Sequence, residues 1–427
     1  MARSKSLFLC VLTVLIALSP LAIGQGLPKV SPKSVGLSQD RLDRITAVMQ
    51  KHVDEGLLAG AVAMVARDGK AAYFQCVGMQ DREKLIAMDP GTIFRIASMS
   101  KAITSVAAMM LYEEGKIRLS DPVSKFIPEF ADVKVLAPND PSAQNGVVPA
   151  KRPITIRHLL THTSGLTYQW DDRVGKLYAE AGITHGLIQD EDLLADDMKK
   201  LARVPLVHQP GEAFTYSLST DVLGRVVEVA SGMPFDEFLQ KRIFTPLKMN
   251  DTGFRLPQNK VSRLAAVYAP DPNGGLMRLP DGILGEGAMK ATVTYPYAGT
   301  HNYRSGGGGL CSTVPDYARF IQMMLNNGQL DGVRLLSRKT VEMMTVDQVG
   351  ELNPGTGFGL GFGVTRNLRE GEETSVGAYR WGGYWYTTFF VDPAEKMIGV
   401  CMAQISPSGK ATLNDQFEAL AHQAIVD

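Results

Sequence analysis

Apolar side chains recur along the first part of the chain with two different spacings. Residues 41–56 (RLDRITAVMQKHVDEG) place them near the 3.6-residue period of a helix and end in a glycine, which is typical of a helix C-terminus. Residues 61–78 (AVAMVARDGKAAYFQCVG) form two apolar runs around Asp68-Gly69, a pair that favours a tight hairpin turn. We therefore expect a helix followed by two antiparallel strands.

A long helical region follows these strands. From about residue 155 to residue 252 the apolar spacing is helical and is interrupted by Gly and Pro, whereas residues 259–303 are rich in both and predict a long irregular segment. A helix is expected again within residues 305–328, where Thr313 and Asp316 have the spacing of a capping box. The remaining patterns predict strands in 357–366, 379–392 and 396–406 and a final helix in 414–427.

Strands thus come first and last, with helices between them. Because strands and helices do not alternate, an antiparallel sheet is favoured over a parallel one. The simplest arrangement is an α+β fold in which both chain ends build one antiparallel sheet flanked by helices. The sheet part would comprise about residues 36–97 and 305–427, and the inserted, mostly helical part about residues 98–304. A site is expected in the crevice between the two parts.

The first 24 residues have a pattern of their own. Arg3 and Lys5 precede the apolar run LFLCVLTVLIALSPLAI, and small residues follow it up to Gly24. A charged start, a short apolar run and small residues are typical of a secretory signal peptide. Pro20 and the short length of the run disfavour a spanning anchor. We predict export to the periplasm or the extracellular space, no stable membrane anchor, and a mature chain of residues 25–427.

Charge and cysteine content restrict the choice of partners. Lys and Arg together number 44, as do Asp and Glu, so the formal net charge is zero and nothing indicates a nucleic-acid partner. Cys76, Cys311 and Cys401 follow the signal segment, and their spacings match no metal motif. Buried thiols are the favoured interpretation, and one disulfide stays open in an oxidising compartment. Nothing in the sequence indicates an oligomeric state.

Ser98 and Lys101 are the strongest candidates for chemistry. They lie where an apolar helix is expected to begin, and a cation is disfavoured there because that end of a helix carries partial positive charge. Residues three apart share a helix face, so the Ser98 hydroxyl and the Lys101 amine can meet. A serine becomes nucleophilic when a base takes its proton, and burial near a positive potential favours a neutral lysine that can do so. The S-x-x-K pattern occurs once in the chain.

Other interpretations of these residues are weaker. A surface lysine beside a capping serine would need no chemistry, and Ser100 is a rival nucleophile, but Lys101 is its immediate neighbour and points elsewhere. The chain contains no G-x-S-x-G elbow and no H-E-x-x-H motif. His158 and His162 lack matching acidic clusters, so we interpret them as structural. The glycine run in SGGGGL lacks the Gly-Lys-Ser/Thr of a phosphate loop and favours close packing.

Together the motifs resemble the penicillin-recognising serine hydrolases. The likeness is closest to the class C beta-lactamase branch and to the esterases of that fold, the family VIII carboxylesterase type. SMSK at 98–101 matches the first family motif, S-x-x-K. Residues 208–228 (HQPGEAFTYSLSTDVLGRVVE) match the region of the second, Y-x-N, with Tyr216 as its tyrosine, and Trp381-Gly382-Gly383 matches the third, K-T-G or H-x-G. The likeness runs from about Gly36 to the C-terminus.

The resemblance implies a mechanism that needs no metal and no cofactor. Ser98 would be the acylated nucleophile, and Lys101 and Tyr216 would share the proton transfers as general base and acid. Backbone N–H groups of Ser98 and Tyr384 would form the oxyanion hole. The residues bordering the substrate would be Trp381, Gly382, Gly383 and Leu218. The plain alternatives are a half-buried loop tyrosine at Tyr216 and a core aromatic at Trp381.

Two departures from the family pattern bear on the substrate. Leu218 stands where the second motif usually has Asn, so an amide that could bond a substrate amide is missing. Trp381 stands where the third motif usually has Lys or His, so a cation that could hold a substrate carboxylate is missing. Beta-lactams and peptidoglycan stems carry both groups. We therefore expect a small neutral acyl ester as the substrate, with weak or absent beta-lactam turnover.

Three alternatives stay open at this point. A beta-lactamase or D-Ala-D-Ala carboxypeptidase would keep the chemistry and change the substrate. An acyltransferase would use a second alcohol in place of water. A non-catalytic binding or assembly protein of the same fold is the alternative of another class, and the presence of Ser98, Lys101 and Tyr216 argues against it.

Overall fold

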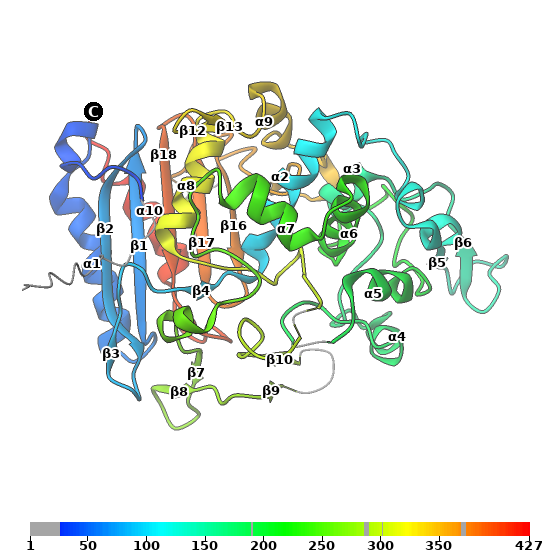
Figure 1. Cartoon of the computed structure of the whole chain (residues 1–427), viewed down its shortest axis with the longest axis horizontal. Helices are drawn as coiled ribbons and strands as arrows, with labels where there is room; N and C mark the ends of the chain where they lie inside the picture. The colour runs from blue at the N-terminus through cyan, green and yellow to red at the C-terminus, as the bar shows by residue number, and fades with distance from the viewer. Residues whose placement is uncertain (1–25, 189–190, 286–289, 301, 369–372) are drawn as a thin grey trace, which may run out of the picture.

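An eight-stranded antiparallel sheet forms the centre of the computed structural model, which describes residues 26–188, 191–285, 290–300, 302–368 and 373–427 (Figure 1). The strand order is β14-β15-β16-β17-β18-β1-β2-β3, so both ends of the chain build the sheet, as the sequence predicts. The expected signal segment lies outside the described residues. The strands are β1 (Gly60–Arg67), β2 (Lys70–Asp81), β3 (Ile86–Ala87), β14 (Gly357–Phe358), β15 (Gly363–Val364), β16 (Tyr379–Gly383), β17 (Thr387–Asp392) and β18 (Met397–Met402).

The central strand β1 is buried on both faces because its alternate side chains enter two different cores. Val62 and Met64 belong to the core that also contains side chains of α2 and α8. Ala63 and Val65 belong to the core that contains side chains of α1 and α10. This alternation is the two-residue period of a strand. The sheet is therefore the middle layer of three.

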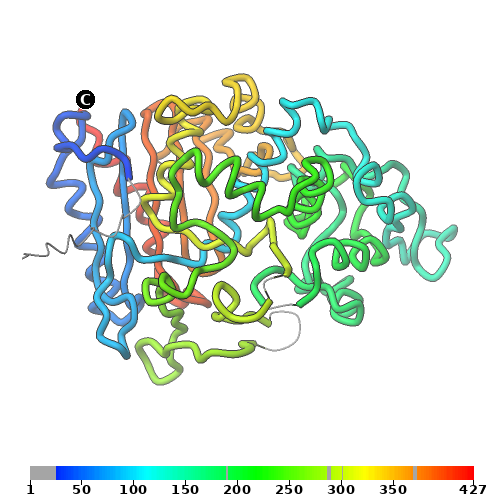
Figure 2. The backbone as a smooth tube through the Cα atoms, in the orientation of Figure 1, coloured from blue at the N-terminus to red at the C-terminus, as the bar shows by residue number. Residues whose placement is uncertain are grey.

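The hairpin between β1 and β2 forms where the sequence predicts it. Asp68 and Gly69 both have positive φ, at 52° and 75°, as a two-residue turn of the primed type requires. The two ends of the described chain also meet, since Leu37 pairs with Ile425 and the Val426 N–H donates to the Gly36 carbonyl at 3.0 Å (Figure 2). The segments before α1 and after α10 are thus held together beside the sheet.

The helices flank the sheet and build the region between its two halves. In the described part of the chain no helix is both long and apolar enough to cross a membrane. The helices are α1 (Gln39–Asp54), α2 (Ser100–Glu113), α3 (Ile156–Leu160), α4 (Gly175–Glu180), α5 (Leu194–Leu201), α6 (Ser219–Ser231), α7 (Phe235–Leu239), α8 (Val314–Leu325), α9 (Arg338–Met344) and α10 (Leu413–His422).

The segment expected to be irregular, residues 259–303, is irregular over most of its described length and also contains two short strand pairs, β7–β8 and β9–β10. The buried guanidinium of Arg95 fixes this segment, because its Nη1 donates to the Ala265 carbonyl at 2.9 Å and its Nε to the Val293 carbonyl at 2.8 Å. Such a long-range tie has no signature in local sequence. The short strands outside the main sheet are β4 (Phe94–Arg95), β5 (Lys134–Leu136), β6 (Val147–Pro149), β7 (Tyr268–Pro270), β8 (Leu276–Arg278), β9 (Ile283–Leu284), β10 (Ala291–Thr292), β11 (Cys311–Ser312), β12 (Gln329–Leu330) and β13 (Val333–Arg334).

Three cysteines lie in the described part of the chain, and none of them forms a disulfide there. Cys311 and Cys401 are buried, and Cys76 is partly buried. Burial raises the pKa of both buried thiols to about 12, so they remain protonated and behave as small apolar side chains.

Helix α8 begins at the cap that the sequence predicts. The Thr313 hydroxyl accepts a hydrogen bond from the Asp316 N–H at 3.2 Å. The fully buried Asp316 carboxyl accepts hydrogen bonds from the Asp251 N–H at 2.7 Å and the Thr252 hydroxyl at 2.9 Å. Burial raises the pKa of Asp316 from 3.8 to about 7.

Replacing Asp316 with asparagine tests this protonated carboxyl. The stability due to Asp316 is complete below its ordinary pKa of 3.8 and is lost as the pH rises through about 7, because the folded state holds a proton that the unfolded state has released. The free energy of unfolding of Asp316→Asn, taken relative to that of the native chain, should therefore rise by about 1 kcal/mol or more as the pH rises from 3.8 to about 7. Urea unfolding of both proteins at several pH values measures this difference. A difference that does not change with pH would contradict the expectation.

Candidate active site

Ser98 lies in a 3₁₀ turn, Ala97–Met99, that leads directly into α2. The sequence predicts that a helix begins at the Ser98–Lys101 motif, and in the structure α2 begins at Ser100, two residues after Ser98. Ala97 has a φ of 40°, a left-handed conformation that costs a non-glycine residue roughly 1–2 kcal/mol. Strained backbone conformations of this kind are found preferentially at functional sites, where the surrounding structure holds them in place. The backbone therefore sets the position of the Ser98 hydroxyl.

Lys101 brings four segments of the chain together at one buried ammonium group. Its side chain is almost completely buried, and Nζ lies 3.4 Å from the Ser98 Oγ, as the three-residue spacing predicts. Nζ also donates to the Gly307 carbonyl at 2.7 Å and to the Tyr168 hydroxyl at 2.9 Å. It lies 4.6 Å from the ring centroid of Tyr216, close enough for a cation–π interaction.

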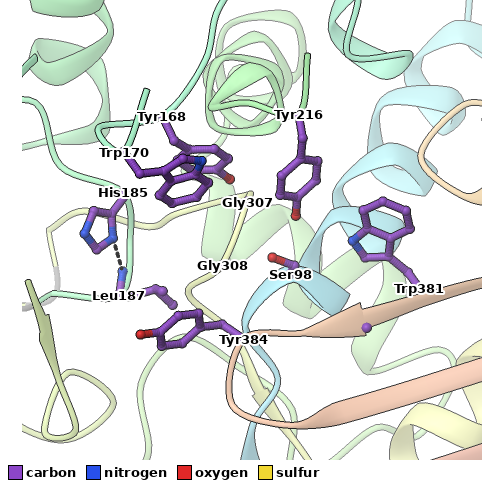
Figure 3. A pocket seen from close by; sticks show the side chains of 11 residues that line it. Ser98, Tyr168, Trp170, His185, Leu187, Tyr216, Gly307, Gly308, Trp381 and Tyr384 are labelled. Carbon is purple, nitrogen blue, oxygen red and sulfur yellow. Dashed lines mark hydrogen bonds between the residues drawn. The ribbon is translucent and has the colours of Figure 1, made fainter. Parts of the chain in front are cut away.

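The two tyrosines beside Lys101 are placed differently. Tyr216 precedes α6, and Figure 3 shows its hydroxyl directed toward Ser98. Among the described residues this buried hydroxyl has no hydrogen-bond partner. Tyr168 follows α3 and bonds Lys101. Burial raises the pKa of Tyr168 well above its ordinary value, and the nearby Tyr216 adds to the rise. Sequence reasoning missed Tyr168, although it follows the family-like phrase LLTHTSGL by two residues.

A cavity of about 700 Å³ opens over Ser98 (Figure 3). Aromatic rings form much of its wall, and Trp170 stacks on Tyr168 with ring centroids 4.1 Å apart. Burial lowers the pKa of His185 to about 4, so this side chain is neutral near pH 7. The described residues that line the cavity thus include no group that is cationic at neutral pH. They are Ser98, Tyr168, Trp170, His185, Leu187, Tyr216, Gly307, Gly308, Trp381, Gly382 and Tyr384.

The third motif lies on strand β16, which borders the same cavity as Ser98. Trp381 and Gly382 line the cavity, and Gly383 packs against the Ile96 carbonyl. A Cβ atom at Gly383 would lie 2.3 Å from the Ile96 carbonyl oxygen, so only glycine fits there. Tyr384 begins the turn after β16 and also lines the cavity. The N–H groups expected for the oxyanion hole therefore belong to residues on the same cavity.

Leu218 is not brought to the cavity. It is fully buried at the start of α6, and it packs in the apolar core instead of lining the pocket wall. The expectation that it borders the substrate therefore has no support from its position, because the turn before α6 directs its side chain inward.

The two histidines singled out in the sequence have structural contacts. The His158 Nδ1 accepts from the Thr155 N–H at 3.2 Å and completes the cap of α3. The ring of His162 is fully buried against Tyr216, and its Nδ1 lies 3.1 Å from the Ser217 hydroxyl. Burial lowers the pKa of both rings, which keeps them neutral.

Comparison with known proteins places these features in a family context. The family described as Beta-lactamase matches residues 45–423. Esterase EstB of Burkholderia gladioli is 33% identical over 365 residues, which cover 82% of this chain and 87% of that protein. Acyltransferase mokF of Monascus pilosus is 29% identical over 336 residues, which cover 75% of this chain and 76% of that protein.

A solved structure has a closely similar fold. It is described as EstCE1, a hydrolase with promiscuous acyltransferase activity, and it has a TM-score of 0.78 and 29% sequence identity. The similarity covers 91% of this chain and 99% of the EstCE1 chain. The likeness therefore includes the sheet, the helices and the segments around Ser98.

Two neighbouring glycines provide a matched test of how tightly the site is packed. A Cβ atom at Gly307 would lie 2.4 Å from the Asp221 Oδ2, whereas at Gly308 its nearest contact would be the Leu187 Cδ2 at 3.5 Å. Gly307→Ala should lower the free energy of unfolding by roughly 1–3 kcal/mol, because the added methyl overpacks the site. Gly308→Ala should change it by much less. The free energies of unfolding of both variants are measured by denaturant unfolding. Equal decreases in the two variants would contradict the tight packing at Gly307.

Proposed function

The chain belongs to the beta-lactamase family, and from that premise we propose that it is an exported serine hydrolase that cleaves neutral acyl esters. The observation that carries the proposal is the Ser98–Lys101 pair, 3.4 Å apart, at the floor of an aromatic cavity. A nucleophile beside a base, with room for a substrate above both, is the arrangement that acyl transfer requires.

The first half of the proposed reaction forms an acyl-enzyme on Ser98. Lys101 and Tyr216 share the role of general base and accept the hydroxyl proton as the Ser98 Oγ attacks the ester carbonyl. The N–H groups of Ser98 and Tyr384 would stabilise the oxyanion that develops. When the tetrahedral intermediate collapses, the alcohol leaves with the proton that the base had taken.

The second half repeats these steps with water. Water attacks the acyl carbonyl, its proton passes to the same base, and the Ser98 oxygen leaves and takes a proton back. The Tyr168 hydroxyl, bonded to Lys101 at 2.9 Å, supports this cycle by fixing the ammonium group. Because the surroundings are buried, each of these polar contacts is stronger than it would be in water.

The cavity wall favours a neutral substrate. A carboxylate or an anionic beta-lactam would enter without a cationic partner among the lining residues, and leaving a charge unpaired in a desolvated site is costly. An ester with an apolar acyl group would bury its surface against Trp170, Trp381 and Leu187 instead.

Acyl transfer to an alcohol is a second candidate. The cavity of about 700 Å³ lies within the size range of sites for drug-sized ligands, so an acyl group and a second alcohol could share it. The names of mokF and EstCE1 both include acyltransferase activity. An apolar wall that disfavours water would raise the share of acyl-enzyme that an added alcohol takes.

Export is part of the same proposal. It rests on the charged start and the apolar run of residues 1–24. The location would bring the enzyme into contact with esters from the periplasm or the extracellular space.

Removing the nucleophile tests the proposal directly. The chain from residue 25 onward is incubated with p-nitrophenyl acetate, butyrate and octanoate and with a chromogenic cephalosporin, beside Ser98→Ala. We expect ester turnover that falls by several orders of magnitude in Ser98→Ala, as in other serine hydrolases, with little cephalosporin cleavage. Fast cephalosporin cleavage would favour the beta-lactamase alternative. Ester turnover that persists in Ser98→Ala would overturn the mechanism.

Trp381 allows a test of the preference for neutral substrates. The native chain should hydrolyse a neutral butyrate ester roughly tenfold or more faster, in kcat/KM, than the matching hemisuccinate ester, which carries a carboxylate. Trp381→Lys should lower the ratio of kcat/KM for the butyrate ester to kcat/KM for the hemisuccinate ester, because it provides a cation on strand β16. Trp381→Phe should leave this ratio unchanged. The ratio is measured by steady-state kinetics on both esters. A native ratio near one would show that the wall does not select against charge.

A further inference from the structure

Asp221 carries a buried carboxylate beside the active site that the proposed mechanism does not use. It is fully buried in the first turn of α6. Its Oδ1 accepts hydrogen bonds from the Ser305 hydroxyl at 2.5 Å, the Tyr303 hydroxyl at 3.3 Å and the Gly307 N–H at 3.4 Å. Its Oδ2 has no hydrogen-bond partner in the part of the chain that the structure describes. A carboxylate so far from water needs a positive charge nearby to offset its loss of solvation.

Lys101 provides that charge from across Gly307. A Cβ atom at Gly307 would lie 2.4 Å from the Asp221 Oδ2 and 3.3 Å from the Lys101 Nζ, so the two groups approach the same point from two sides. They are therefore within the roughly 4–6 Å over which opposite charges perturb each other. Glycine at position 307 is what leaves room for this approach.

Asp221 also holds the loop that receives Lys101. The Gly307 N–H and the Ser305 hydroxyl donate to the carboxylate, and the Gly307 carbonyl accepts from the Lys101 Nζ at 2.7 Å. One peptide segment is thus fixed by the carboxylate on one side and by the ammonium group on the other. Moving either charge would move the loop and the floor of the cavity, which Gly307 and Gly308 line.

We propose that Asp221 is a positioning residue whose carboxylate is the buried counter-ion of Lys101, and that it sets both the charge and the place of that ammonium group. The inference rests on the proposed function, because it assigns the proton transfers to Lys101 and Tyr216. Asp221 does not line the cavity, so it acts through Lys101 and does not touch the substrate.

The titratable groups around Asp221 come from four parts of the chain. Lys101 faces it from α2, Tyr303 bonds it from the loop before Gly307, and the charge of Asp221 adds to the raised pKa of Tyr168. Burial raises the pKa of Tyr303, and the charges of Asp221 and of Asp197 on α5 add to that rise. Burial raises the pKa of Asp221 itself, and the charge of Lys101 and the hydrogen bond from Ser305 oppose that rise.

The sign of the effect on catalysis follows from charge alone. A nearby negative charge stabilises a protonated lysine and disfavours a tyrosine anion. Whichever of Lys101 and Tyr216 gives up the proton before attack, removing the carboxylate favours the deprotonated form. In Asp221→Asn, the rise of kcat/KM on the acid side of the pH profile should therefore occur at lower pH; we call this rise the acid limb. The substitution keeps the shape of the side chain and one acceptor oxygen, and it removes the negative charge.

The experiment follows the pH dependence of Ser98 labelling by a fluorophosphonate probe and of kcat/KM for p-nitrophenyl butyrate. In Asp221→Asn we expect the acid limb to shift down by about one pH unit or more. The maximal rate should fall by roughly tenfold to a hundredfold, because Lys101 is less well placed. Ser305→Ala, which loses one hydrogen bond but keeps the charge, should lower the rate without moving the limb. Asp316→Asn, which changes a fully buried carboxyl group that does not line the cavity, should leave the profile unchanged over the pH range in which both proteins are folded.

A second measurement covers the case in which Asp221→Asn folds but is too unstable for its pH profile to be followed. If the two groups are counter-ions, each single variant leaves one buried charge uncompensated, and removing both charges relieves the loss. Lys101→Met combined with Asp221→Asn should therefore unfold at a higher temperature than Asp221→Asn alone. A double variant no more stable than the single ones would overturn the proposal.

The outcomes separate this inference from the proposed function. A folded Asp221→Asn whose acid limb coincides with that of the native enzyme would reduce Asp221 to a loop anchor while the hydrolase assignment stands. A native chain that neither reacts with the probe at Ser98 nor hydrolyses the ester would instead remove the function on which the inference rests.

Discussion

The buried ammonium group of Lys101 is the constraint around which the site is built. A charge removed from water must be surrounded by protein oxygen atoms, and those atoms must be held in place against their own thermal freedom. The chain meets this need with the Gly307 carbonyl, the Tyr168 hydroxyl and the nearby Asp221 carboxylate, which come from three separate segments. Solvating one lysine thus fixes α2, α6 and two loops relative to one another.

Two kinds of surroundings meet at Ser98. Below it lie the charged and hydroxyl groups to which we assign the proton transfers, and above it lies a cavity walled by aromatic rings. The polar groups below Ser98 are buried, so nearly all of them must be hydrogen-bonded. The aromatic wall above Ser98 must lose its bound water at little cost when a substrate enters. The Tyr216 hydroxyl, which points toward Ser98, lies at the boundary between the two (Figure 3). A phenol in this place can form a hydrogen bond with an oxygen atom of a bound substrate.

The local sequence predicts much of the fold because its apolar residues clearly follow the 3.6-residue period of helices and the two-residue period of strands. The β1–β2 hairpin, helix α8 and the strands β16 to β18 lie where alternation, helical spacing and turn residues indicate. The motif residues Ser98, Lys101, Tyr216 and Trp381 also come together, since a short spacing and a family pattern specify them. Asp221 and Tyr168 were not predicted, because their roles depend on contacts between distant segments that no periodicity records. Leu218 was assigned to the substrate because its motif position was visible while the inward direction of its side chain was not.

The left-handed Ala97 sets a limit on how this site can change over evolution. Glycine would remove the conformational penalty at that residue, yet it would also let the turn before α2 sample other shapes and so blur the position of the adjacent hydroxyl. Bulkier residues would meet a core that leaves Ala97 no exposed surface. Alanine is thus a compromise between a more relaxed chain and a more definite position of the Ser98 hydroxyl. Under the proposed mechanism, a gain in thermal stability at position 97 would lower the reactivity of Ser98, so stabilising changes are better sought in the outer helices.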